Sequence, residues 1–177
     1  MDIEALEKFV VPYYQNKDIM HDISHIERVL KCVERLLKNT NESVDSEAII
    51  YAAYFHGFIY SAENEIIVWL KNSGIPEEKI NFITKVAWES QKSEVPDTLE
   101  GKILHDAHMT EGGKTYLIVK SLITGSVRGQ TLEQTISYIE NSILGKGCCY
   151  LPEARNIYAD QQKFTEEFIK DLKEGLI

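Results

Sequence analysis

Apolar residues recur every three or four positions along most of this 177-residue chain, and no segment shows the sustained apolar–polar alternation of a strand. One such stripe starts at Ile26 and continues through Val29 and Val33 to Leu37. An α-helix repeats every 3.6 residues, so this spacing places the apolar side chains on one face that can be buried. The sequence therefore predicts an all-α protein.

Capping and breaking residues set the expected ends of the helices. Asp45 or Ser46 is suited to the N-cap position of one helix. Pro76 suits the first turn of another, and Thr131 with Gln134 forms a capping box. Glycine and proline residues end most of the segments. The expected helices cover residues 25–37, 45–56, 65–72, 76–87, 99–111, 131–144 and the stretch from 152 onward.

Composition and charge limit the classes of partner. Hydrophobic residues make up 44% of the chain, which is enough for one sizeable core, and no repeat or linker divides the sequence. We therefore expect a single domain over residues 1–177. The formal net charge of −9 at pH 7 repels phosphate backbones and anionic lipids. Nucleic acid polymers and membranes are poor partners for such a surface, and a phosphorylated ligand would need local positive charge.

The cysteines and the N-terminus indicate the cellular compartment. The three cysteines show no CxxC spacing, and their odd number leaves no complete disulfide framework. The N-terminal segment lacks the basic and apolar regions of a signal peptide, and no apolar stretch approaches the length of a membrane span. We therefore expect a cytoplasmic protein with reduced thiols. A homodimer is compatible with the sequence, which does not decide the oligomeric state.

Three polar residues lie on inward faces of the expected helices. His25 projects from the apolar stripe described above, His56 shares a face with Ala52, and Asp106 shares one with Ile103. Buried polar groups are costly unless they meet one another or an ion, and helical bundles build metal sites from facing helices. Each residue taken singly is more often a hydrogen-bonded core side chain, but the similar placement of three favours a shared metal site.

Four segments resemble, in order and spacing, the motifs of the small HD-superfamily phosphohydrolases. Residues 21–29 read HDISHIERV, similar to the HDxxHxxRV opening of that family. Residues 48–57 read AIIYAAYFHG, similar to its apolar helix that ends in His-Asp. Residues 96–108 read PDTLEGKILHDAH, similar to a block that usually reads TLEAKIxxDADRLDA, and residues 154–168 resemble its last helix. The resemblance extends from about residue 12 to residue 174.

The resemblance implies an all-helical HD-type bundle around one divalent cation. By motif position, the ligands of that ion would include His25, His56 and Asp106. The motifs do not distinguish among Mn, Mg, Fe, Ni, Co and Zn. Family members use the metal to bind phosphate and to activate a water molecule, so the resemblance also implies a small phosphorylated molecule or a nucleotide as the substrate.

The chain departs from the family pattern beside the expected site. The Asp that follows His56 in the family is Gly57 here, so one acidic ligand is missing. The second Asp of the DxD motif falls on His108, and the His of a family His-Ser pair falls on Glu89. His108 and Glu89 are therefore candidate replacements for the missing carboxylate. Together with Asp106 they are the candidate catalytic residues.

The missing acid affects which ions and which functions are expected. Mg²⁺ and Mn²⁺ prefer oxygen ligands and should lose more affinity than Zn²⁺, Ni²⁺ or Fe²⁺. Arg28, Lys102 and Lys114 are candidate phosphate-binding cations, although such residues are more often solvated. We expect a metal-dependent phosphohydrolase. The alternatives are an HD scaffold that has lost catalysis and binds a nucleotide or metabolite, and a helical domain that holds no ion.

Overall fold

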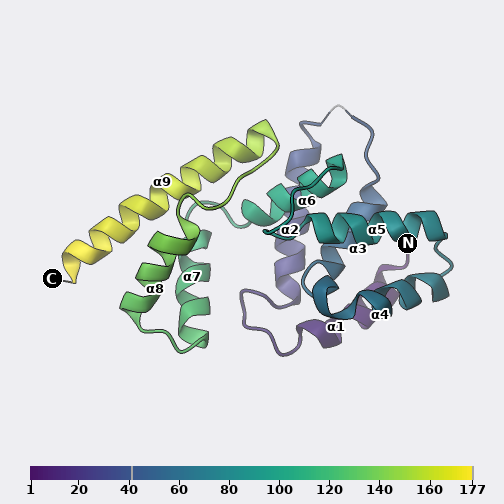
Figure 1. Ribbon diagram of the computed structural model, residues 1–177, viewed down its shortest axis with the longest axis horizontal. Coiled ribbons are helices and arrows are strands. Elements are labelled where there is room, and N and C mark those ends of the chain that lie inside the picture. The colour runs from purple at the N-terminus through teal and green to yellow at the C-terminus, as the bar shows by residue number, and fades with distance from the viewer. Residues whose placement is uncertain (41, 177) are drawn as a thin grey trace. The chain divides into compact units, whose positions relative to one another are not determined.

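The computed structural model describes residues 1–40 and 42–176, and all regular structure within these residues is helical, as the apolar spacing predicted. The same residues contain no helix that is long and apolar enough to cross a membrane. The elements are α1 (Ile3–Tyr14), α2 (Ile23–Leu37), α3 (Ser46–Phe55), α4 (Ile59–Asn72), α5 (Glu77–Glu89), α6 (Leu99–Met109), α7 (Tyr116–Val127), α8 (Leu132–Tyr138), the π-helical segment η1 (Ile139–Ile143) and α9 (Pro152–Gly175) (Figure 1).

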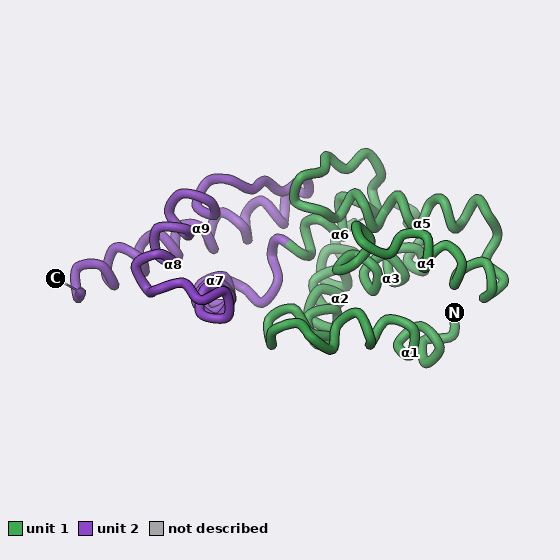
Figure 2. Tube along the Cα trace, turned by 60° about the horizontal axis from the view of Figure 1, so that its bottom comes forward, with its two compact units in different colours: residues 1–108 green, residues 109–177 purple. Residues whose placement is uncertain are grey.

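The helices group into two compact units, Met1–His108 and Met109–Ile177 (Figure 2). The first unit contains α1 to α5 and nearly all of α6, and the second contains α7 to α9. Each unit has apolar residues buried within it. The single domain expected over residues 1–177 stays a prediction.

Helix α3 is the central element of the first unit and packs against α1, α2 and α5. All but one of its residues from Ala48 to Phe55 are buried, and a helix that is apolar on every side has to lie in the interior. Asp45, one of the two residues predicted for this position, is its N-cap, and the Asp45 carboxylate accepts a hydrogen bond of 3.0 Å from the Ala48 N–H. The interior position of α3 brings its C-terminal end, and His56 with it, into the middle of the unit.

Aromatic rings fasten α1 onto this core. Phe9 stacks on Trp69 with ring centroids 5.0 Å apart, and Tyr13 stacks on Phe58 at 4.1 Å. Pairs of this kind add about 1 kcal/mol each beyond the burial of their area. The sequence analysis did not predict α1, which carries Pro12 in its last turn. Tertiary packing of its rings therefore outweighs the local preference against a proline inside a helix.

Two other differences from the predicted helices have local causes. Helix α4 begins at Ile59 and not at Glu65, because its first turn is separated from the rest by non-helical backbone at Ala62. Helix α7 was not predicted, and no side-chain hydrogen bond caps its start. At Ala62 the helical backbone is interrupted, and the apolar periodicity that predicts a helix is interrupted with it. The start of α7 lacks the side-chain cap that would predict it.

The second unit is built around isoleucines of α8, η1 and α9. Ile136, Ile139 and Ile169 form its buried cluster. The predicted capping box is present, since the Gln134 N–H donates to Thr131 Oγ1 at 3.2 Å and the Thr131 N–H donates to Gln134 Oε1 at 2.9 Å. The helix predicted to run to about residue 144 is α-helical to Tyr138 and continues as η1.

Candidate metal centre

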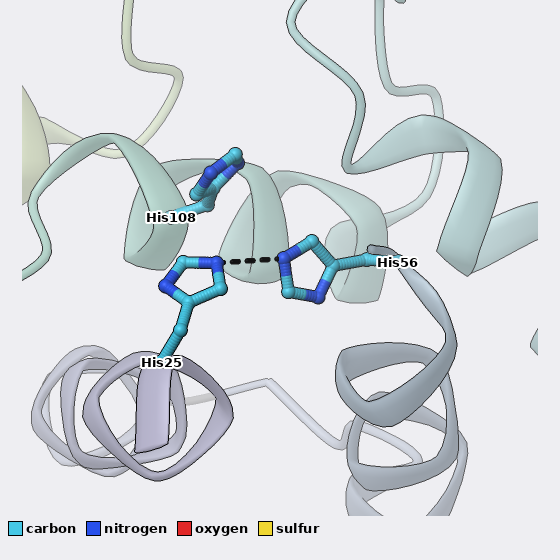
Figure 3. Close-up of side chains that lie close together, drawn as sticks. All are labelled: His25, His56 and His108. Carbon is cyan, nitrogen blue, oxygen red and sulfur yellow. Dashed lines mark hydrogen bonds between the residues drawn. The ribbon is translucent and has the colours of Figure 1, made fainter. Parts of the chain in front are cut away.

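Three histidines from three helices converge in the first unit (Figure 3). His25 lies in the first turn of α2, His56 is the C-cap of α3, and His108 lies in the last turn of α6. One ring nitrogen from each side chain lies within 4.8 Å of the other two. The ring centroids are 5.0, 5.1 and 5.3 Å apart, so the three rings form a nearly regular triangle.

The hydrogen bonds of His56 direct one of its nitrogens toward the other rings. His56 Nδ1 lies 2.6 Å from the carbonyl oxygen of Ala53, and a carbonyl only accepts, so Nδ1 carries a hydrogen. In the neutral ring Nε2 then has a lone pair, and this atom lies 3.0 Å from His25 Nε2. A carbonyl that fixes the tautomer of a ligating imidazole is a common arrangement in metal sites. His25 and His56 are only 3% and 4% exposed, so both imidazoles are shielded from water.

The start of α2 is held by side chains of the first sequence motif. Asp22 is the N-cap and accepts from the Ser24 N–H at 3.0 Å. Arg28 donates to Ser24 Oγ at 2.7 Å and to the carbonyl oxygen of Met20 at 3.4 Å. These contacts fix the turn that presents His25. They also give Arg28 a structural role, and its predicted role in phosphate binding stays a prediction.

The end of α3 is held through the carbonyl groups of Tyr54 in its last turn and of the two residues that follow the helix, His56 and Gly57. The Tyr54 carbonyl accepts from the Tyr14 hydroxyl at 2.9 Å, and the His56 carbonyl accepts from the Gln91 amide at 2.8 Å. The Gly57 carbonyl accepts from Lys17 Nζ at 2.6 Å. Carbonyls at a helix end lack partners within the helix, and a cation is favoured there by the helix dipole. The backbone that carries His56 is therefore held in place by side chains from two other parts of the chain.

The space beside Gly57, where the family pattern has an aspartate, is filled. A Cβ atom at this position would lie 2.5 Å from the Tyr14 hydroxyl oxygen and 3.0 Å from Lys17 Nζ. Burial raises the pKa of Tyr14 above its usual value and lowers that of Lys17. The Lys17 ammonium also lies 4.4 Å from the centroid of the Tyr14 ring. A phenol and an ammonium group thus occupy the place where the family has a carboxylate.

Helix α6 carries a second buried polar pair. Asp106 is completely buried, and its Oδ1 accepts from His105 Nδ1 at 3.2 Å. Asp106 is not one of the residues whose ligand atoms come within 4.8 Å of one another; His108, two positions later, is. The assignment of Asp106 as a ligand stays a prediction. His108 is one of the two residues predicted as a replacement for the missing carboxylate.

Glu89 is used to hold the loop before α6. Its carboxylate accepts from the Asp97 N–H at 3.1 Å and the Thr98 N–H at 3.3 Å, and also from the Thr98 hydroxyl. Glu89 is absent from the histidine group. A Cβ at position 101 would lie 1.9 Å from Glu89 Oε2, so Gly101 makes room for this carboxylate. These contacts give the buried Glu89 carboxylate a structural role, and its predicted roles as a replacement ligand and a catalytic residue stay predictions.

The predicted phosphate-binding lysines lie in different units. Lys102 is half-buried on α6 in the first unit. Lys114 belongs to the second unit, where its ammonium lies 5.1 Å from the centroid of the Phe164 ring. The roles of both lysines in phosphate binding stay predictions.

The sequence analysis missed three residues that shape the centre. Tyr14, Lys17 and Gln91 contact the end of α3 but belong to none of the family motifs. Their partners are backbone carbonyls far away in sequence, which no spacing rule reveals. Gly57 gives a weak signal for these residues, because a glycine at a motif position leaves a space that other side chains must fill.

Comparison with known proteins identifies the fold. No family model matches the sequence, and no curated protein matches it. Among solved structures, the Lin1889 protein of Listeria innocua has 23% identity and a TM-score of 0.75, with 98% of this chain and 94% of that chain covered. Bacillus subtilis YpgQ in complex with ADP has 18% identity and a TM-score of 0.74, with 95% and 96% covered.

A third structure carries a functional description. It is an HD-superfamily hydrolase from Bacillus thuringiensis with 18% identity and a TM-score of 0.75, covering 98% of this chain and 96% of that one. Coverage of nearly the full length of both chains means that the shared architecture includes the helices that bear all three histidines. The chain therefore has the fold of the HD-superfamily hydrolases, as its motifs predicted.

Proposed function

We propose that this protein is a metal-dependent phosphohydrolase that acts on a small phosphorylated molecule. The observation that carries the proposal is the convergence of His25, His56 and His108 in a fold shared with an HD-superfamily hydrolase. The donor set fits a divalent ion, because three imidazole nitrogens lie close together and the His56 tautomer presents a lone pair to the group. A bound divalent ion would supply positive charge for the phosphoryl oxygens and would lower the pKa of a water molecule.

The residues of the chain would supply orientation and proton transfer. Hydrogen bonds to the carbonyls at the end of α3 hold His56, and the capped first turn of α2 holds His25. We assign Asp106 as the carboxylate that accepts a proton from the attacking water, with His105 orienting it through Nδ1.

A nucleotide is the first class of substrate to test. YpgQ, which shares the fold at 18% identity, was crystallised with ADP. With a net charge of −9, this protein needs local cations to hold a polyphosphate. We assign that role to Arg28 and Lys102 in the first unit, and we keep Lys114 of the second unit as a separate candidate for a phosphate contact.

The test is phosphate or pyrophosphate release from a panel of nucleotides and phosphorylated metabolites, with Mn²⁺, Co²⁺, Ni²⁺, Zn²⁺ or Mg²⁺ added singly. We expect turnover of at least one compound, and loss of that turnover in His56→Ala. Lys170→Ala is the control, because this side chain is 79% exposed in the second unit and should leave the rate unchanged. No release from any compound with any of these ions would contradict the proposal.

A second candidate is an HD scaffold that binds a nucleotide or metabolite without hydrolysing it. The filled space beside Gly57 favours this alternative, since Tyr14 and Lys17 stand where the family has an acidic ligand. A thermal shift with a nucleotide and no product would support it. Turnover that disappears in His25→Ala would exclude it.

We also propose a reducing compartment, the cytoplasm, for this protein. Cys32, Cys148 and Cys149 form no disulfide among the described residues, although Cys148 is exposed. In an oxidising compartment an exposed thiol would be prone to oxidation or to intermolecular pairing. Fractionation of cells that produce the tagged protein would test this directly.

A further inference from the structure

We infer that His108 is a metal ligand and that the resulting three-nitrogen site selects Zn²⁺, Co²⁺ or Ni²⁺ over Mg²⁺ and Mn²⁺. The inference rests on the proposed function in that it concerns the same centre. It adds to the proposed function that the His108 imidazole takes the place of the carboxylate ligand that is missing at Gly57. The consequence is a change in the chemical class of ion, which can be measured without any substrate.

The distances among the three histidines suit a tetrahedral ion. Two nitrogens bound to Zn²⁺ at the usual bond length lie about 3.4 Å apart. His25 Nε2 and His56 Nε2 are 3.0 Å apart, and the widest separation within the group is at most 4.8 Å. Small rotations of the rings would therefore bring all three nitrogens to one ion.

His108 is as close to the pair as its two members are to each other. Its ring centroid lies 5.3 Å from that of His25 and 5.1 Å from that of His56 (Figure 3). It is less buried than the other two. Three histidines with an open fourth position are a common ligand set of catalytic zinc.

The charges around the centre disfavour hard ions. Three neutral imidazoles bring no negative charge and leave Asp106 as a remaining carboxylate candidate, whereas Mg²⁺ and Mn²⁺ are held chiefly by carboxylate and other oxygen ligands. The ammonium of Lys17 lies beside Gly57, at the place of the missing acid, and it would repel a cation. Nitrogen ligands compensate for this with Zn²⁺, Co²⁺ and Ni²⁺, which bind imidazole well. The three histidines and the Lys17 ammonium thus favour Zn²⁺, Co²⁺ or Ni²⁺ over Mg²⁺ and Mn²⁺.

The experiment measures binding of each ion to protein prepared without chelators. Titration calorimetry with Zn²⁺, Co²⁺, Ni²⁺, Mg²⁺ and Mn²⁺ gives the affinities, and the visible absorption of Co²⁺ reports its coordination. We expect one Zn²⁺ per chain, intense absorption typical of tetrahedral Co²⁺, and binding of Mg²⁺ and Mn²⁺ weaker by about two orders of magnitude. Equal affinity for Mg²⁺ and Zn²⁺ would overturn the inference.

Variants at position 108 test the ligand itself. His108→Ala should weaken Zn²⁺ binding by about 100-fold and alter the Co²⁺ spectrum. His108→Asp should recover part of the binding and shift the preference toward Mn²⁺, because it returns an oxygen ligand. Unchanged Zn²⁺ affinity and an unchanged spectrum in His108→Ala would overturn the inference. Circular dichroism without metal shows whether each variant is folded.

Cys148→Ser is the matched control for adventitious binding. Its thiol is exposed, and thiolates bind Zn²⁺ and Co²⁺, so it is the competing soft ligand of the chain. The variant should keep the full stoichiometry and spectrum. If Cys148→Ser loses the ion and His108→Ala retains it, the histidine site is refuted.

The outcomes also separate this inference from the proposed function. Zn²⁺ binding that depends on His108, without turnover of any compound, would contradict the hydrolase and support the ligand set. Turnover with Mn²⁺ that is unaffected by His108→Ala would support the hydrolase and overturn the ligand set.

Discussion

The end of α3 and the start of α6 both carry a glycine where the family pattern has a side chain, but they use the space differently. At Gly57 an acidic ligand is missing, and Tyr14 with Lys17 fills the position. At Gly101 only a methyl group is missing, and Glu89 fills the position. Neither glycine has a positive φ, so the absent Cβ, and not backbone freedom, explains both.

At Gly57 the chain has lost a metal ligand of the family pattern, whereas at Gly101 it has gained a carboxylate that holds the backbone before α6. Filling the space at Gly57 replaces negative charge next to His56 by the positive charge of Lys17. Filling the space at Gly101 adds a carboxylate that binds the backbone before α6, the helix that carries His108. We infer that the changes act in one direction: the centre becomes poorer in oxygen ligands, while the helix with the extra nitrogen ligand is held more firmly.

The largest effect is expected for Gly101→Ala. The new Cβ would lie 2.8 Å from Glu89 Cβ, which is anchored to α5 and cannot move away as a flexible chain end would. The variant should lose about 3 kcal/mol of unfolding free energy, the upper end of the usual overpacking cost. Urea unfolding followed by circular dichroism measures the change.

A double-mutant cycle makes this prediction specific to Glu89. Glu89→Ala alone should also destabilise, because the N–H groups of Asp97 and Thr98 lose their acceptor. Glu89→Ala combined with Gly101→Ala should cost less than the sum of the two single changes, because the contacts of the new Cβ with Glu89 Oε2 and Cδ are gone and only the contact with Cβ remains. Strict additivity would show that the two residues are not coupled, and the comparison with position 57 would then fail.

The second largest effect is expected for Gly57→Asp, the change that restores the family residue. The Cβ would approach the Tyr14 hydroxyl, which is buried and bonded to the Tyr54 carbonyl, so the variant should lose about 2 kcal/mol. The new carboxylate would pair with Lys17 Nζ, so we expect little gain in Mn²⁺ affinity. Thermal unfolding and Mn²⁺ titration measure the two effects.

Removing the Lys17 ammonium should leave the new carboxylate at position 57 available to bind a metal ion. Lys17→Met with Gly57→Asp should bind Mn²⁺ more tightly than Gly57→Asp alone, and Lys17→Met alone is the control. A large increase in Mn²⁺ affinity in Gly57→Asp alone would refute the inference that Tyr14 and Lys17 prevent an acid at position 57 from binding the ion.

The sequence predicted the elements whose signals are local. Asp45 and the pair Thr131 and Gln134 act as predicted because a cap and its N–H partner lie within three residues of each other. Helices α1 and α7 were missed because packing partners elsewhere in the chain stabilise them, as the stacking of Phe9 on Trp69 illustrates. Local capping and apolar spacing thus predict a helix better than they predict what it packs against.

The candidate site divides in the same way. Motif order brought His25 and His56 to attention, and the structure places their Nε2 atoms 3.0 Å apart. The position of His108 and the support role of Glu89 depend on how α6 is turned against α2, α3 and α5, which no motif spacing encodes. The structure brings the ligand atoms of His25, His56 and His108 together, and the assignment of Asp106 as a ligand stays a prediction.

A smaller effect is expected for Gln91→Ala, which removes the donor to the His56 carbonyl. One partly buried hydrogen bond contributes about 1 kcal/mol to stability. Because it acts on the backbone of a ligand, we expect Zn²⁺ affinity to fall by about 10-fold as well. Calorimetric titration checks the affinity, and Gln91→Glu, which keeps the size but loses the amide donor, should behave like the alanine variant. Unchanged affinity in both would mean that Lys17 and Tyr14 suffice to hold the end of α3.

The smallest effect concerns the pH dependence of stability at the start of α3, where the N-cap Asp45 contacts the first turn of α6. The Asp45 N–H donates to Glu100 Oε1 of α6 at 2.9 Å, and the Asp45 carboxylate pairs with Lys79. Burial by itself raises the pKa of Asp45, but the bonds from Lys79 and from the Ala48 N–H outweigh it and hold the pKa below the usual 3.8. A depressed pKa in the folded state adds stability that is present above pH 3.8 and is lost as the pH falls through the folded value.

Asp45→Asn keeps the capping oxygen and removes the titration, so it isolates this contribution. Because the side chain is a third exposed, solvent screens the pair and the difference should be a few tenths of a kcal/mol. Unfolding measured from neutral pH down to about pH 3 should show the wild type losing its small advantage only at the acid end. An advantage that persisted undiminished in acid would mean that Asp45 joins α3 to its neighbours through its backbone and cap alone, without its charge.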